Sequence, residues 1–104
     1  MQTHSKVRID ILIESPLRTR MAALLEQHEV SGYTIFQALG GRGLEGGWSR
    51  SGQIIDVGQR LLFTCILDGA RVGGLLEDVF DQMAGHLGYV TTADVHVVRD
   101  SKFP

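Results

Sequence analysis

The chain has 104 residues, of which 43% are hydrophobic and 21% are charged, and its formal net charge is -2. A chain of this length builds one hydrophobic core, and the composition is typical of a folded globular protein rather than of a disordered chain, so residues 1–104 are treated as one domain. The slight acidic excess disfavours a nucleic-acid partner, because binding to a phosphate backbone depends on positive charge.

The amino-terminal segment mixes charged and apolar residues and has no continuous apolar stretch, so neither a signal peptide nor insertion into a membrane is predicted. The single cysteine, Cys65, has no internal partner for a disulfide and lies among residues that favour a strand. A packed thiol is therefore expected, and the cytoplasm is the expected location.

The first 39 residues have the pattern of a β-α-β unit. Residues 7–13 alternate apolar with charged residues, which is typical of a strand with one buried face. Ser15 and Pro16 suit the N-cap and first turn of a helix, which is expected to run to about Glu29. Residues 33–39 are rich in aromatic and β-branched residues, and they predict a second strand.

A second β-α-β unit is predicted towards the carboxyl end. Residues 60–67 are apolar on both faces and predict a third strand. Asp68 is expected to cap a helix whose apolar stripe extends from Val72 to Leu87, with Gly88 as its left-handed C-cap. Alternation in residues 89–99 predicts the fourth strand.

The order β-α-β-loop-β-α-β predicts an α+β protein of the ferredoxin-like class, with both helices on one face of a four-stranded antiparallel sheet. The other face is then uncovered. In the third strand Leu62 and Ile66 alternate with Leu61, Phe63 and Cys65, so apolar side chains are expected on the uncovered face as well. Self-association would remove them from water.

Between the second and third strands, residues 40–59 lose all hydrophobic periodicity and contain seven of the thirteen glycines, so a long loop without secondary structure is expected. Glycines let backbone N–H groups approach an anion, and arginine adds a permanent charge. The residues that suggest such a site are Gly40, Gly41, Arg42, Gly43, Arg50 and Arg60. A flexible hairpin tip kept soluble by arginines explains the same residues equally well. Trp48 is expected to contact a partner or its own subunit rather than a base.

The stretch VSGYTIFQALGGRG, from Val30 to Gly43, resembles PII signalling proteins, in which a Ser-Gly-x-Thr strand leads into the glycine-rich, arginine-containing start of the T-loop. The later order agrees over nearly the whole chain: a T-loop of about residues 40–59, a strand, a helix, a turn at Gly88 and a last strand that ends in an arginine.

Departures from ordinary PII proteins point to a subfamily. Gly41 stands in place of a phenylalanine, Gly88-Tyr89-Val90 in place of a Gly-Asp-Gly-Lys turn, and Arg99 is single rather than paired. The T-loop also lacks a tyrosine, which weighs against control by uridylylation, and the departures together weigh against tight 2-oxoglutarate sensing. The sequences GYTIF and RSGQ are more similar to the PII-like proteins of inorganic carbon handling, which include the SbtB type and the carboxysome-associated type. The cysteine-bearing extension of many SbtB proteins is missing here, so the carboxysome-associated type is the more similar of the two.

This resemblance implies a homotrimer, not an enzyme, that binds ADP or AMP (with ATP as a further candidate) in clefts between subunits, and bicarbonate as a second ligand. It implies signalling of inorganic carbon or energy status through the T-loop to a bicarbonate transporter or a carboxysome component. One side of the cleft would be lined by Thr34, Gly40, Gly41, Arg42 and Gly43. The base and phosphates would meet Gly88, Tyr89 and Val90, the terminal phosphate would meet Arg99 of a neighbouring subunit, and Arg50 is a further candidate.

Simpler interpretations remain open for each residue: Thr34 pairs only in the sheet, Gly88 only caps a helix, and Arg99 is only solvated. The alternative function is a CutA-like or structural ferredoxin-fold trimer, with a metal-binding or scaffolding role. No pair of histidines has metal-ligand spacing on one element, and Ser49 and Ser51 have no neighbouring base, so neither a metal centre nor nucleophilic catalysis is predicted.

Overall fold

A computed structural model describes residues 1–43, 46–49 and 59–99. In chain order, its elements are β1 (His4–Glu14), the 3-10 turn η1 (Ser15–Leu17), α1 (Arg18–Gln27), β2 (Tyr33–Gln37), β3 (Gly40–Gly43), β4 (Gly46–Ser49), β5 (Arg60–Leu67), the 3-10 turn η3 (Gly69–Arg71), α2 (Val72–Met83) and β6 (Gly88–Val97). None of the helices in these ranges is long and apolar enough to cross a bilayer.

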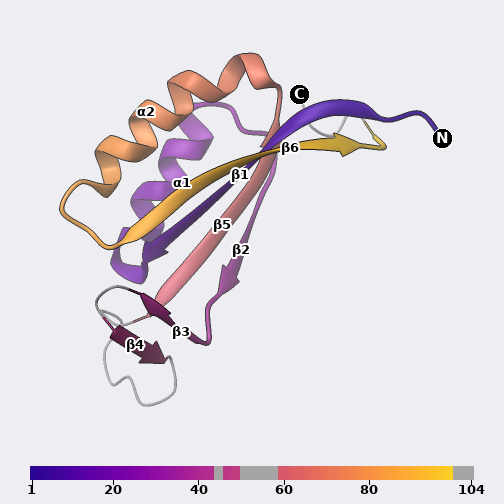
Figure 1. Cartoon of the computed structure of the whole chain (residues 1–104). Coiled ribbons are helices and arrows are strands. Elements are labelled where there is room, and N and C mark those ends of the chain that lie inside the picture. Colours follow the sequence, from indigo (N-terminus) through magenta and orange to yellow (C-terminus); the bar gives the residue numbers. More distant parts are fainter. Residues whose placement is uncertain (44–45, 50–58, 100–104) are drawn as a thin grey trace.

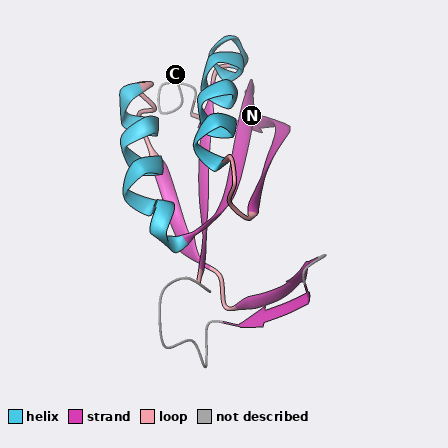
Figure 2. Ribbon diagram, turned by 90° about the vertical axis from the view of Figure 1, so that its left-hand side faces the viewer, coloured by secondary structure: helices cyan, strands magenta, loops and turns pink. Residues whose placement is uncertain are grey.

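The main sheet has four antiparallel strands in the order β2-β5-β1-β6. Figure 1 shows α1 and α2 side by side on one face of it, and Figure 2 shows the same two layers after a quarter turn. The central strands β1 and β5 come from different halves of the chain, so both halves contribute to one sheet. The predicted ferredoxin-like fold is confirmed.

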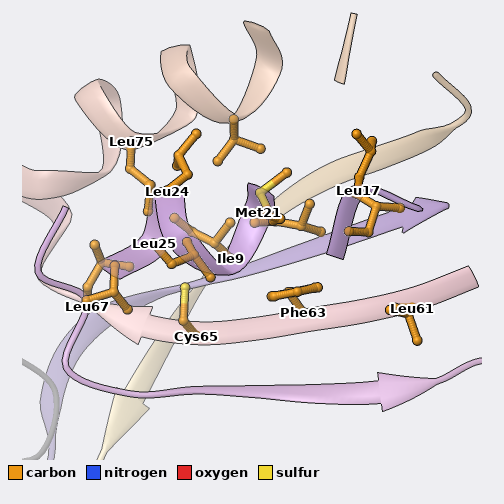
Figure 3. Packing of buried hydrophobic residues seen from close by; sticks show 14 residues of the cluster. Ile9, Leu17, Met21, Leu24, Leu25, Leu61, Phe63, Cys65, Leu67 and Leu75 are labelled. Carbon is orange, nitrogen blue, oxygen red and sulfur yellow. The ribbon is translucent and has the colours of Figure 1, made fainter. Parts of the chain in front are cut away.

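The hydrophobic core fills the space between the helices and the sheet. From Ile9 to Ile13 on β1, and along the whole of β5, every second side chain is buried beneath the helices. Figure 3 shows Phe63, Cys65 and Leu67 of β5 directed towards Leu24 and Leu25 of α1. Alternation in the sequence therefore predicted the buried face correctly, and the packed state of Cys65 is confirmed.

The opposite face of the sheet carries no helix, and one row across it is entirely apolar or aromatic. Phe36 on β2 lies opposite Leu62 on β5. Leu62 lies opposite Leu12 on β1, and Leu12 lies opposite Tyr89 on β6. Phe36 and Tyr89, at the two edges, are 53% and 52% exposed. The expectation of apolar side chains on the uncovered face is confirmed, and Phe36, Leu12 and Tyr89 extend it beyond Leu62 and Ile66.

A polar row lies beside the apolar one. The Thr64 hydroxyl donates a 2.7 Å hydrogen bond to Asp10 Oδ1, and Arg8 Nε donates to Asp10 Oδ2 at 3.2 Å. Thr34 stands opposite Thr64 on the edge strand β2. Asp10 is thus held by two donors in the middle of the uncovered face.

The predicted helix caps are wrong at both amino ends. Ser15 is not an N-cap: it opens the 3-10 turn η1, its N–H donates to the Gln59 carbonyl at 3.0 Å, and α1 begins only at Arg18. Asp68 makes no capping bond either, because its carboxylate accepts a 2.7 Å hydrogen bond from the Lys6 ammonium. Both residues are bound by a partner distant in sequence, Ser15 through its backbone N–H and Asp68 through its carboxylate.

The carboxyl ends of the helices also differ from the prediction. α1 ends at Gln27, and Glu29 has a left-handed φ of 57°. α2 ends at Met83, and Gly85, with φ of 80°, is the left-handed residue that follows it. Gly88 is therefore not the C-cap: it is the first residue of β6, and Leu87 lies outside the helix, 46% exposed.

The expectation that residues 40–59 lack secondary structure is wrong for the part of this segment that the structure describes. β3 and β4 pair antiparallel, with Gly40 opposite Ser49 and Gly43 opposite Gly46. Figures 1 and 2 place this hairpin outside the body formed by the helices and the main sheet. Glycine gives a strand no apolar pattern, so this pairing left no periodic signal in the sequence.

Candidate functional site

The predicted site residues form two groups at the same end of the main sheet. Register aligns Gln37, Leu61, Ile13 and Gly88 in one row across the strands β2, β5, β1 and β6. The T-loop segment leaves just past Gln37, at one edge, and the turn group begins at Gly88, at the other. Three strand spacings, roughly 14 Å, separate the edges, so a single chain does not bring the two groups together.

The T-loop group is fully open to solvent. Thr34 is exposed on β2, and Gly40, Gly41, Arg42 and Gly43 form the exposed strand β3. Arg42 stands opposite Gly47, which has no side chain that could cover it. Its guanidinium is therefore accessible to an anion, as the sequence suggested. Arg50 lies outside the described residues.

The turn group borders a cavity of about 410 Å³ between the end of α2 and the start of β6. Its lining residues are Phe80, Met83, Ala84, Gly85, His86, Gly88, Tyr89 and Val90. Three of the predicted residues, Gly88, Tyr89 and Val90, thus lie at one hollow. The Phe80 side chain, 74% exposed, stands at its rim and also borders the next hollow along the strand.

Gly88 is placed there by a close approach of two strands. Its φ is 145°, and a Cβ built on it would lie 2.0 Å from the Leu12 carbonyl oxygen and 3.0 Å from Met83 Cε. Any other residue would collide with the β1 backbone. The sheet therefore requires a glycine at position 88 whether or not a ligand binds there. This requirement comes from the close approach to β1 and not from a helix cap, which was the simpler interpretation.

Two residues at this turn, Glu14 and His86, were not predicted from the sequence. Glu14 Oε1, on β1, accepts a 2.9 Å hydrogen bond from the Leu87 N–H and lies 3.7 Å from His86 Nδ1. These contacts join positions more than 70 residues apart in sequence, which no local pattern reveals. For His86, the only available signal was its position two residues before Gly88.

Arg99 lies far from both groups within one chain. β6 runs from Gly88, beside Ile13, to Val97, beside His4, so Arg99 follows the opposite end of the sheet. The nine residue steps of extended chain from Gly88 to Val97 span roughly 30 Å. Arg99 therefore cannot meet the phosphate of a nucleotide at Gly88 of its own chain.

Two other reactive groups among the described residues, Cys65 and Asp78, have structural roles. Burial, helped by the Asp10 carboxylate, raises the pKa of the Cys65 thiol to about 11 from 9.0, which makes it a poor nucleophile at neutral pH. The Asp78 carboxylate lies 2.6 Å from His28 Nε2 and so links α2 to the residue that follows α1. Within the ranges described, no three His, Cys, Asp or Glu side chains gather as a metal site would require.

Solved structures with the same fold include complexes of CPII, a nitrogen regulatory PII-like protein from Thiomonas intermedia K12. The complex with ADP, AMP and bicarbonate superposes with a TM-score of 0.88 at 25% identity, covering 98% of this chain and 96% of that one. The complex with ADP and bicarbonate superposes with a TM-score of 0.84 at 27% identity, covering 99% of this chain and 98% of that one. The complex with ADP, AMP and acetate superposes with a TM-score of 0.80 at 25% identity, with the same coverage of the two chains.

No curated protein matches the chain in a sequence search. The family description "Nitrogen regulatory protein P-II" matches residues 6–102, which extend from β1 past the end of β6. This match covers both site groups and the T-loop between them, and it speaks against the CutA-like alternative. The chain belongs to the nitrogen regulatory protein P-II family.

Proposed function

We propose that this protein is a PII-like regulator of the carboxysome-associated or SbtB type, not an enzyme, that binds ADP or AMP in clefts between the subunits of a homotrimer. The observation that carries the proposal is the division of the candidate site. Two groups of residues lie at one end of the sheet but at opposite edges, so the T-loop edge of one subunit completes the turn edge of the next.

The chemistry of the two groups is complementary. Exposed Arg42 and the glycine backbone of β3 offer charge and N–H donors to phosphates, while Tyr89, Val90 and Phe80 offer apolar and aromatic surface to a base. Arg99, at the far end of its own β6, reaches such a cleft only from a neighbouring subunit. ATP is a further candidate ligand, held by the same groups.

Bicarbonate is the proposed second ligand, since CPII complexes hold it together with ADP, with and without AMP. Ligand binding would select one arrangement of the T-loop, residues 40–59, and thereby signal inorganic carbon or energy status. A bicarbonate transporter or a carboxysome component is the proposed partner, and the cytoplasm the proposed location.

The test combines sedimentation with calorimetric titration. Sedimentation of the purified protein should give a trimer, and ADP or AMP should bind with a stoichiometry of one per chain, while GDP serves as the control for the base. Arg42→Gln should weaken ADP binding about tenfold without lowering thermal stability, because Arg42 is exposed. A monomer, or the absence of heat at millimolar ADP, AMP and ATP, would overturn the proposal.

A further inference from the structure

The cavity at the turn group presents one side chain that can carry a positive charge. Its lining contains no lysine or arginine, and its only titratable members are His86 and Tyr89. Tyrosine is neutral or negative, so within one chain the His86 ring is the cationic partner that this cavity offers to an anion.

The ring belongs to a turn whose backbone is fixed on both sides. The His86 N–H donates a 2.9 Å hydrogen bond to the Met83 carbonyl, and the next N–H, of Leu87, donates to Glu14 Oε1 at 2.9 Å. The same carboxylate oxygen lies 3.7 Å from His86 Nδ1. Glu14 thus faces one nitrogen of the ring, and among the described residues no group bonds the other, Nε2.

Charges around the ring are otherwise mostly acidic. The charged and titratable groups that face it are Glu14 from β1, Tyr89 from β6, Asp78 and Asp81 from α2, and Arg20 from α1. A phosphate approaching through this neighbourhood would be repelled by carboxylates unless it met the imidazole directly. Among the residues that line the cavity between α2 and β6, which do not include Arg20, the Nε2 donor of His86 is therefore the side-chain group that favours a phosphate.

We propose that His86 is a phosphate-binding residue of the nucleotide site, donating from Nε2 to ADP or AMP while Glu14 positions the ring through Nδ1. The inference rests on the proposed function and deepens it. His86 adds a phosphate donor on the turn edge to the donors that Arg42 and β3 offer from the T-loop edge, and the apolar part of the same cavity recognises the base. Adenosine, which has the base without the phosphate, should not depend on His86.

The experiment compares ADP with adenosine in calorimetric titrations of the wild-type protein, His86→Ala and His86→Gln. His96→Ala is the matched control, because His96 is an exposed histidine on β6, beside Ser5 at the far end of the sheet. His86→Ala should weaken ADP binding by about ten- to a hundredfold and leave adenosine binding within about twofold. His86→Gln, whose amide still donates, should lose less, and His96→Ala should change neither ligand.

Two results would overturn the assignment: ADP binding unchanged in His86→Ala, or ADP and adenosine weakened by the same factor, which would mark His86 as a purely structural residue of the turn. Retained adenosine binding shows that the variant is folded. Failure of the wild-type protein to bind either ligand would be a different result, because it removes the proposed function and this inference with it.

Discussion

Gly88 at the start of β6 lies so close to Leu12 on β1 that a methyl group at its Cα would stand 2.0 Å from the Leu12 carbonyl oxygen. The contact fixes where the last strand begins, and hence where Tyr89 and Val90 border the cavity. One glycine thus serves the sheet and the candidate site together.

Gly88→Ala should destabilise the protein by about 2 kcal/mol or more, because the β1 backbone cannot yield to a Cβ and the φ of 145° is unfavourable for alanine. Urea unfolding at fixed protein concentration measures the effect. Gly74→Ala, in α2 with open space around it, is the control and should stabilise by about 0.5–1 kcal/mol. Equal midpoints for the two variants would show that the close approach is absent in solution.

Glu14→Ala should loosen the turn before β6, since the Leu87 N–H would lose the acceptor that holds it to β1. The free energy of unfolding should fall by about 1 kcal/mol, and exchange of the Leu87 amide hydrogen should become faster. Glu14→Gln keeps an oxygen acceptor at the same position and should retain most of the protection. If both variants exchange like the wild type, Glu14 does not hold the turn.

The fold was predictable wherever one face of an element is buried. Alternation in β1 and the apolar stripe of α2 predicted these elements and their buried sides, because burial on one face imposes a period on the sequence. β5 was predicted as an apolar run without such a period. Element ends were predicted less well. Ser15 and Asp68 have the chemistry of helix caps, yet the Gln59 carbonyl binds the backbone N–H of Ser15, and Lys6 of β1 binds the carboxylate of Asp68.

The candidate site was predictable only in part. The glycines and Arg42 were found because they are unusual in composition, and Gly88, Tyr89 and Val90 because they follow a helix in a family-like order. Glu14 and His86 were missed, since their relation depends on β1 and β6 being adjacent. The β3–β4 hairpin was missed because glycine strands have no hydrophobic period.

Cys65 should make the stability of the protein depend on pH in the alkaline range. Burial raises its pKa in the folded chain to about 11, above the ordinary 9.0, so folding favours the protonated thiol. This contribution is complete below about pH 9 and is lost as the pH rises through about 11. The wild type should therefore lose up to about 2–3 kcal/mol more than Cys65→Val between these values, measured by urea unfolding at each pH.

The comparison with Cys65→Val cancels the contribution of other groups that titrate in this range. One of them is Tyr33, because burial and the hydrogen bond to Glu26 raise its pKa as well. A thiol-reactive dye gives a second measurement: at about pH 8 the folded protein should react far more slowly than the urea-unfolded chain. Parallel pH profiles for the two proteins, or fast labelling of the folded one, would contradict the burial of this side chain.

Leu62→Asp should convert the proposed trimer to monomers, because Leu62 lies in the middle of the apolar row on the uncovered face, between Phe36 and Leu12. A carboxylate there would have to be desolvated in an interface, whereas in a single chain it can reach water. Sedimentation measures the assembly state, and circular dichroism the fold. Ala23→Asp, on the exposed side of α1, introduces the same charge away from this face and should remain trimeric. If Leu62→Asp sedimented as the wild type does, the subunits would have to meet through another surface.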